Sequence, residues 1–245
     1  MISSAGTTAS TSLLSQAIAA AKSNAAANSA AASSSTSTAT SSSTGSLSSL
    51  GGNFNQFLTL LTTQLQHQDP SNPTSTDSFT AELAQFAGVQ QQVETNTNLT
   101  SLISATQDNQ MASAVSLIGK TTTASSSSLP LQGGAASLSF TAPQAGDVAI
   151  AVTDNTGTVV KSETIDAASG TNTWKWDGKN NAGTQLNDGA YTVAVEGSST
   201  DGTSVALPTT ITGTVTGVSK SSSGVNIDMG DATIDMSDLT GFSDT

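Results

Sequence analysis

The chain holds few residues that could carry catalysis or ligate a transition metal. It has no cysteine and a single histidine, His67, followed two positions later by Asp69. Serine, histidine and aspartate form a hydrolytic triad, but no nucleophile-elbow motif accompanies His67, whose place near the end of an expected helix suits the helix dipole instead. Zinc sites use several cysteine or histidine ligands. We therefore expect no enzyme, no catalytic residue and no bound cofactor.

Two acidic stretches invite a calcium interpretation. Residues 177–181 read Asp-Gly-Lys-Asn-Asn, but a lysine stands where a calcium loop carries Asp or Asn, and no glutamate closes the loop. We expect a turn there. The second acidic group comprises Asp228, Asp231, Asp235 and Asp238. These carboxylates could hold a weak calcium ion between strands, but polar residues alternating along the solvent face of a β-hairpin explain them more simply. No metal site is therefore predicted.

Composition disfavours two classes of partner. The 245 residues include 6 lysines, no arginine and 18 acidic residues, for a formal net charge of −12. A phosphate backbone requires clustered cations, and an anionic membrane surface attracts polybasic segments. The scattered lysines provide neither, and no apolar run approaches the roughly 18 residues of a membrane span. We expect binding to neither nucleic acid nor membrane.

A first amphipathic helix and a proline elbow precede the rest of the ordered chain. Apolar residues at i, i+4, i+7 and i+11 predict this helix, with the stripe Phe54, Leu58, Leu61 and Leu65. The sequence Gln-Asp-Pro-Ser-Asn-Pro at 68–73 ends it, because proline lacks an N–H group and restricts the residue before it.

A second helix is expected from about Ser78 to Ile118, capped by Thr76 or Asp77. The run at 95–98, Thr-Asn-Thr-Asn, has low helix propensity, so we expect a break or bend near it. A small domain cannot cover so long a stripe, and burying one Phe or Leu side chain is worth about 1.5–3 kcal/mol. We therefore expect the apolar face to meet other chains, the alternative being a simple hairpin of the two helices. The stripe comprises Phe79, Leu83, Phe86, Val89 and Val93.

The first 52 residues are almost entirely Ala, Ser and Thr, with one charge at Lys22. No basic residue precedes the weakly apolar run at 13–21, so a cleaved signal peptide is not expected. Such a composition buries too little apolar surface to offset the entropy of ordering the backbone. We expect residues 1–52 to be disordered.

After Gly119 the apolar period changes from 3.6 to 2, which predicts strands. Turn sequences containing Gly, Asn and Asp separate them, and short alternating strands at this spacing predict a β-sandwich. We expect Trp174 and Trp176 to lie in its core, the alternative being an exposed platform for ligand stacking. Residues sharing a face are Leu138 with Phe140, Val148 and Ile150 with Val152, Trp174 with Trp176, and Tyr191 and Val193 with Val195.

Three blocks of the sequence resemble the bacterial flagellar hook-capping protein family, also called the basal-body rod modification proteins. The first is FLTLLTTQLQHQDPSNP at 57–73 with FTAELAQFAGVQQ at 79–91. The second is VSLIGK at 115–120, and the third is WDGKNNAG at 176–183 with DGAYTV at 188–193. Together they cover about residues 54–200.

The resemblance implies an α+β fold that is mainly β, in which a fibronectin/Ig-like β-sandwich is inserted into a small tudor-like β-barrel. On this sequence, residues 1–52 would be a disordered tail and 53–118 a helical segment for oligomerisation and docking. The barrel would comprise 119–135 plus 203–240, and the sandwich 136–202. The tail is either a passive extension or, as the resemblance implies, an export signal.

The resemblance also implies a function: a scaffold that caps the growing flagellar hook and promotes insertion and polymerisation of hook subunits. The protein would be exported through the flagellar channel to the distal tip of the hook, and its partners would be hook subunits and about five copies of itself in a ring. An alternative is a secreted adhesin or carbohydrate-binding β module with a helical stalk, which predicts exposed aromatic side chains and calcium-dependent stability.

Two sets of residues are expected to matter most. The first sets the orientation of the two helices as an elbow, and comprises Gln68, Asp69, Pro70, Asn72 and Pro73. The second anchors contacts with other copies or partners, and comprises Phe54, Leu58, Leu61, Phe79, Leu83, Phe86 and Val93.

Overall fold

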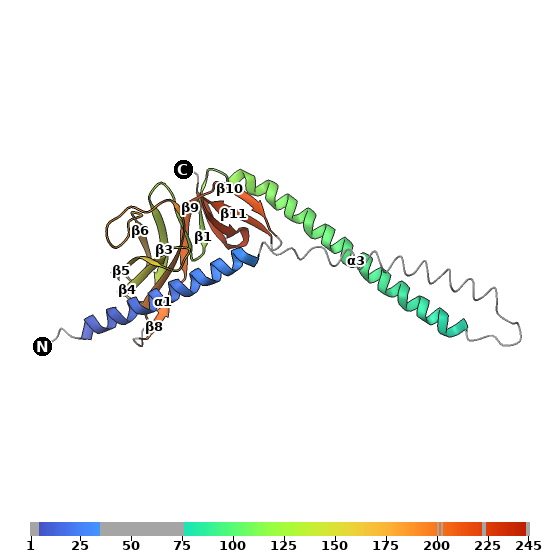
Figure 1. Cartoon of the computed structure of the whole chain (residues 1–245), viewed down its shortest axis with the longest axis horizontal. Helices are drawn as coiled ribbons and strands as arrows, with labels where there is room; N and C mark the ends of the chain where they lie inside the picture. The colour runs from blue at the N-terminus through green and yellow to red at the C-terminus, as the bar shows by residue number, and fades with distance from the viewer. Residues whose placement is uncertain (1–4, 35–75, 200, 202, 222–223, 244–245) are drawn as a thin grey trace, which may run out of the picture. The chain divides into compact units, whose positions relative to one another are not determined.

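The computed structural model describes residues 5–34, 76–199, 201, 203–221 and 224–243 (Figure 1). Two long helices, α1 (Ala5–Ser34) and α3 (Thr76–Ala114), precede a β-rich region. By their contacts, α1 and the residues from Gln107 onward form one compact unit, and the helical residues up to Thr106 belong to a second. We call the part of the first unit from Gln107 onward the β unit, treat α1 as a helix packed on it, call the second unit the helical unit, and describe the two units separately.

Helix α3 runs without interruption through the Thr-Asn-Thr-Asn sequence at 95–98, so the expected break there is wrong. The hydroxyl groups along the helix donate to the backbone carbonyl four residues earlier, as from Thr97 to Val93 at 3.0 Å and from Thr100 to Asn96 at 2.9 Å. These bonds satisfy the side chains that otherwise compete with the helical backbone, so the polar run remains helical.

The β unit contains three antiparallel sheets. One follows the order β13-β1-β9-β3-β6, a second the order β2-β7-β4-β5 with β8 paired to β7, and the third the order β10-β11-β12. The strands are β1 (Thr121–Ser125), β2 (Ser128–Leu131), β3 (Ala136–Ala142), β4 (Gly146–Thr153), β5 (Val159–Ala167), β6 (Gly170–Trp176), β7 (Gly189–Ser198), β8 (Ser204–Ala206), β9 (Thr209–Thr214), β10 (Gly217–Lys220), β11 (Val225–Met229), β12 (Ala232–Asp235) and β13 (Leu239–Ser243), with 3₁₀ turns at Val115–Leu117 and Met236–Asp238.

The predicted alternation places the core correctly. Val148, Ile150 and Val152 of β4 are buried, and one apolar cluster joins them to Leu138 and Phe140 of the facing sheet. The two sheets therefore pack as a sandwich with an apolar interior, as in Ig-like folds. The fold is mainly β, as the sequence indicates.

Both tryptophans lie in this core, which confirms the prediction for Trp174 and Trp176. The Trp174 indole N–H donates to Glu163, and that of Trp176 donates to the Lys179 carbonyl at 2.9 Å, so neither buried donor is unsatisfied. Tyr191 meets Trp176 edge-to-face, with ring centroids 5.1 Å apart. Its hydroxyl donates to the backbone carbonyl four residues earlier, the arrangement known as a tyrosine corner in Ig-like sandwiches.

The segments before and after the sandwich meet in one sheet. Strand β1 pairs with both β9 and β13, so the segment after Gly119 joins strands that lie far downstream in the sequence. The predicted hairpin is present too, because Ile227 of β11 pairs with Ile234 of β12. Strand β9 also pairs with β3, so a single sheet continues from these segments into the sandwich. A tudor-like closure of the flanking strands into a barrel stays a prediction.

Candidate assembly surfaces

Two surfaces of the described residues, one on a helix and one on a sheet, are suited to contact with a helix. The first lies on α3, where three large apolar side chains are exposed: Leu99 by 51%, Leu102 by 63% and Ile103 by 59%. Their spacing of three and four residues places them together on one side of the helix. We call these three residues the α3 patch. Complete burial of a fully exposed Leu or Ile side chain is worth about 1.5–3 kcal/mol, and these side chains are 51–63% exposed, so covering the patch would gain a corresponding fraction for each.

The apolar residues of α3 do not form one continuous stripe. Val89 is 46% exposed and Val93 is half-buried. An α-helix turns by about 100° per residue, so this pair faces a direction roughly 110° away from the α3 patch. The change of direction occurs across the polar run at 95–98. One helix therefore offers apolar surface in two directions.

The predicted site residues are described only in part. Those of the first helix and the elbow lie outside the described residues, and they are Phe54, Leu58, Leu61, Gln68, Asp69, Pro70, Asn72 and Pro73. Phe79, Leu83 and Phe86 lie within α3, although their side chains are outside the described part. Sequence reasoning missed Leu99, Leu102 and Ile103 as exposed residues because the polar run before them interrupts the stripe. Their own spacing of three and four was the available signal.

The last turns of α3 are anchored in the β unit. Ala114 is fully buried in the apolar core, and Met111 and Leu117 pack against it. Lys220 of β10 forms an ion pair with Asp108, with 2.7 Å between Nζ and Oδ1. Residues 107–117 are thus fixed to the strands by one apolar and one charged contact.

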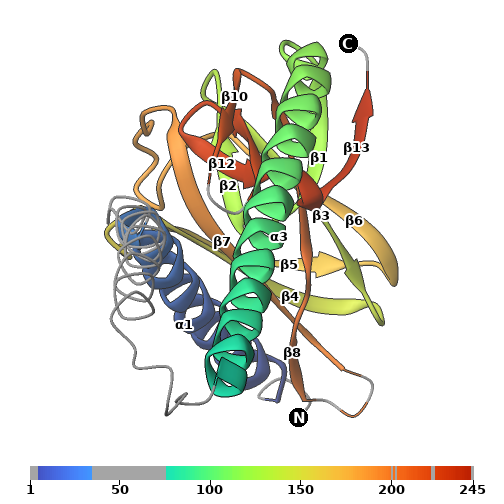
Figure 2. The same cartoon turned by 90° about the vertical axis from the view of Figure 1, so that its right-hand side faces the viewer.

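The second surface is the outer face of the sandwich sheet, where α1 lies along β4 and β7 (Figures 1 and 2). This helix contradicts the expectation of disorder for Ala5–Ser34. Its contact residues recur every four positions and are mostly alanines, and the strand residues beneath it are alanines too. One apolar cluster comprises Leu13, Ala17 and Ala21 of α1 with Ala149, Ala151 and Ala194 of the strands. We call the face floored by Ala149, Ala151 and Ala194 the α1 groove.

Small residues explain why so polar a segment can dock. Alanine side chains on both surfaces allow the helix axis to approach the sheet closely, so dispersion contacts replace large apolar side chains. Polar contacts are few: the Asn28 amide donates to the Thr192 hydroxyl at 3.2 Å, and the Ser29 hydroxyl donates to the Asn155 carbonyl at 3.3 Å. The Thr153 hydroxyl also reaches the Ala21 carbonyl at 3.4 Å.

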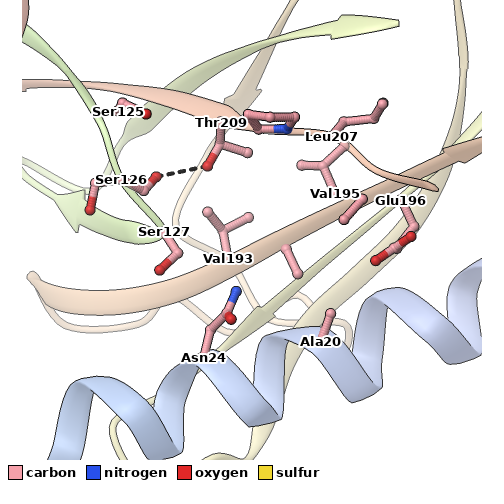
Figure 3. A pocket seen from close by; sticks show the side chains of 13 residues that line it. Ala20, Asn24, Ser125, Ser126, Ser127, Val193, Val195, Glu196, Leu207 and Thr209 are labelled. Carbon is pink, nitrogen blue, oxygen red and sulfur yellow. Dashed lines mark hydrogen bonds between the residues drawn. The ribbon is translucent and has the colours of Figure 1, made fainter. Parts of the chain in front are cut away.

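A shallow cavity of about 350 Å³ lies beside α1, between the helix and β7 (Figure 3). Ala20 and Asn24 form its helical wall, Val193 and Val195 belong to its strand wall, and Ser126 lies on its polar rim. The Thr209 hydroxyl closes that rim by donating to the Ser126 carbonyl at 2.7 Å. The mixed lining fits the edge of a helix-docking groove better than an enclosed small-molecule site, which is usually deeper and more apolar.

The acidic hairpin is held by hydrogen bonds within the protein. Asp228 accepts from the hydroxyls of Ser219 and Thr233, and Asp235 accepts from the Ser237 amide at 2.8 Å. Among the described residues, no three histidine, cysteine, aspartate or glutamate side chains gather closely enough to hold a metal ion. Neither described helix has the length and apolar character that crossing a lipid bilayer requires.

Comparison with known proteins identifies two family models in the chain. Residues 7–101 match the N-terminal region of the flagellar hook capping protein, and residues 125–201 match the FlgD Ig-like domain. The first match spans most of α1 and of α3, and the second spans the strands from β2 to β7.

Curated relatives agree with both models. The basal-body rod modification proteins FlgD of Salmonella typhimurium and of Escherichia coli K12 are each 32% identical over 186 residues, covering 72% of this chain and 80% of theirs. Among solved structures, FlgD from Xanthomonas campestris matches 55% of this chain and 99% of its own, with 24% identity and a TM-score of 0.47. The chain therefore belongs to the flagellar hook-capping protein family.

Proposed function

We propose that this protein is the scaffold that caps the growing flagellar hook and promotes the insertion and polymerisation of hook subunits. A role in flagellar hook assembly follows from its family, since relatives with 32% identity over most of the chain are basal-body rod modification proteins. The cap at the hook tip, reached by export through the flagellar channel, is the finer step of the proposal. Its action requires binding surfaces and no bond chemistry.

The single observation that carries this proposal is the exposed α3 patch of Leu99, Leu102 and Ile103. Contiguous exposed apolar residues on a long helix indicate a contact surface for another helix, and we propose that this helix belongs to another copy. Self-association provides this contact, because every copy brings the same helix. The proposed partner of the patch is therefore α3 of a neighbouring copy.

The two apolar directions of α3 favour a ring over a closed pair. A two-fold dimer joins identical patches, whereas a head-to-tail contact joins two different patches and continues until the rotation closes. The α3 patch and the Val89–Val93 side are two such different surfaces on one helix. A ring of about five copies, as the family resemblance implies, fits this geometry.

The predicted elbow and the remaining anchors complete the proposal. The elbow at 68–73 would direct the first helix against the second, and Phe54, Leu58 and Leu61 would extend the contact between copies. Phe79, Leu83 and Phe86 share the helical spacing of Val89 and Val93, so they would lengthen that side of the interface. Hook subunits would then meet the assembled helices and the β units.

The two tryptophans do not meet the main requirement of the adhesin alternative. It needs aromatic side chains presented on a sheet face, and Trp174 and Trp176 are buried in the core with their indole N–H groups bonded within the protein. On the described strands, Phe242 of β13 is exposed by 72%, but a single aromatic side chain does not form a stacking platform, so a role in hook assembly remains the better-supported function.

Complementation tests the proposal. In a strain deleted for this gene, the wild-type chain should restore hooks, whereas Leu102→Asp with Ile103→Asp should leave basal bodies without hooks and release hook subunits into the medium. A matched control, Gln91→Asp with Ser101→Asp, adds the same charge at exposed positions that are not three or four residues from the α3 patch, and should restore hooks. Normal hooks with the first double variant would contradict the assignment of the α3 patch.

A further inference from the structure

The α1 groove is built to receive a helix rather than to face solvent. Outward-facing residues of β4 and β7, which normally meet water on one side of an antiparallel sheet, are here buried as completely as the core residues. Ala149 and Ala151 are fully buried beneath α1, and Ala194 nearly so. Removing the helix would expose this floor, so the β unit requires an occupant for the groove.

Helix α1 depends on the groove in return. It carries no acidic residue in its first turn and no basic residue in its last, so the helix dipole receives no charge stabilisation. Helices in proteins gain most of their stability from packing rather than from propensity, and we expect the same of this 30-residue segment rich in Ala, Ser and Thr. Docking and helix formation are therefore coupled, and a helix that leaves one groove must enter another to remain folded.

The length of chain between α1 and α3 does not restrict α1 to the groove of its own chain. About 40 residues separate the end of α1 at Ser34 from the start of α3 at Thr76. At about 3.4 Å per residue such a segment spans up to roughly 140 Å, about three times the length of α1 itself. When α1 docks on the strands of its own chain, the residues of the helical unit form a closed loop. Closing a loop costs entropy, and this cost rises only slowly with the number of residues in the loop.

We propose that in the assembled protein the α1 groove of one copy holds α1 of a neighbouring copy. This inference rests on the proposed self-assembly through α3. Exchange replaces each contact by an identical one, which makes swapped elements an inexpensive route to joining copies. Once α3 contacts bring copies together, a neighbour's groove offers an effective concentration comparable with that of the chain's own groove.

The exchange would give each copy two kinds of link to its neighbours. The α3 contact joins large apolar side chains, and the α1 contact joins a helix to a sheet through small ones. Linked weak contacts hold an assembly together by avidity while each can open separately. A scaffold that shifts as subunits are inserted requires this combination.

Disulfide trapping tests the exchange, because the natural chain has no cysteine. Asn28 of α1 and Thr192 of β7 are in side-chain contact, so cysteines at these two positions report occupation of the groove. Full-length Asn28→Cys and Thr192→Cys, each a single variant, are mixed as dilute reduced protein, concentrated and then mildly oxidised. A disulfide between position 28 and position 192 in this mixture can form only between chains.

Three controls accompany the mixture. Thr171→Cys, an exposed threonine on β6, replaces Thr192→Cys in a parallel mixture. The double variant with both cysteines in one chain shows that the pair can form a disulfide at all. Sedimentation of the same samples reports the oligomer independently. We expect the 28–192 linked peptide, identified by mass spectrometry, to be at least about tenfold more abundant than its 28–171 counterpart.

The outcomes separate the two proposals. Oligomers whose mixture contains the 28–192 peptide support the exchange. Oligomers in which only the double variant forms the disulfide, and only within one chain, overturn the exchange and leave the proposed function standing. A double variant without any disulfide also overturns it, since α1 would then not occupy the groove. Protein that stays monomeric at every concentration overturns both proposals.

Discussion

Helices α1 and α3 are both long and polar in composition, yet their surroundings differ. Along α1, small side chains at every fourth position are buried against β4 and β7 of the same unit. Along α3, branched side chains at comparable spacing are exposed, and among the side chains of this helix that the structure describes, Ala114 is the buried one. One helix has its apolar side chains covered within its own chain, and the other leaves large apolar side chains exposed.

The size of the contact residues accounts for the difference. Alanines of α1 meet Ala149 and Ala151 on a flat sheet, where close approach supplies the packing energy. Leucine and isoleucine require deeper holes of the kind that facing helices form when their side chains interlock. Leu13 of α1 is buried on the alanine floor, so a leucine can fit there, but the other buried residues of the row are alanines, whereas α3 exposes three large side chains. Each prediction below tests one side of this contrast.

The largest effect is expected at the α3 patch. Leu102→Asp with Ile103→Asp would place two carboxylates in the interface, and burying an unpaired charge costs several kcal/mol. Self-association measured by light scattering should weaken by at least about 100-fold, while the melting temperature of the β unit stays unchanged. Gln91→Asp with Ser101→Asp serves as the matched control and should assemble normally, because neither position neighbours the patch on the helix surface. Equal association of both double variants would show that the patch is not an interface.

A smaller effect is expected at the α1 groove. Ala17→Glu places a carboxylate against the sheet at a fully buried position, whereas Ala26→Glu adds the same group at an exposed position of the same helix. Ala17→Glu should release α1, raising amide hydrogen exchange in residues 11–30 by at least about tenfold. Ala26→Glu should leave exchange at the wild-type rate. Protection that survives Ala17→Glu would mean that docking does not hold the helix.

The smallest effect concerns acid and the turn beneath the end of α1. Burial alone would raise the pKa of the Asp154 carboxyl, but hydrogen bonds from the Thr156 hydroxyl and from the Thr158 and Thr156 amides outweigh it and lower the pKa below its ordinary 3.8. A lowered pKa in the folded state stabilises the fold above the unfolded value and is lost as the pH falls through the folded value. Because the group is largely exposed, the contribution is a few tenths of a kcal/mol.

Thermal melts at pH 6 and pH 3 measure this contribution. Asp154→Asn should lower the melting temperature slightly at pH 6 and have a lesser effect at pH 3, so that its stability depends less on pH than that of the wild type. The Ser29 hydroxyl of α1 donates a hydrogen bond to the carbonyl of Asn155, the residue after Asp154. The substitution therefore also affects the contact between this turn and α1. The same pH dependence in both proteins would assign acid sensitivity to other carboxylates.

The β unit was largely predictable because its signal is local. Val148, Ile150 and Val152 alternate with smaller residues, and the structure buries all three in the core as expected. The pairing of β1 with β9 and β13 joins residues that lie far apart in sequence, so it came from the family resemblance and not from the pattern itself.

The helices were harder because their signals depend on distant partners. The composition of residues 5–34 did not predict enough burial to offset the entropy of ordering the backbone. The helix α1 is explained by its packing on the alanines at 149, 151 and 194 of the outer sheet face, which lie far away in the sequence. The expected break in α3 failed because the hydroxyls of Thr97 and Thr100 bond back along the helix, which propensities averaged over other proteins do not anticipate. The elbow stays a prediction, since it lies outside the described residues.

Sedimentation velocity of the full wild-type chain over a range of concentrations tests the central claim most directly. If α3 is completed by its neighbours, the protein should pass from monomer to one discrete species of about five copies as the concentration rises into the micromolar range. A single monomeric species at all concentrations, with the α3 patch left in water, would contradict the account.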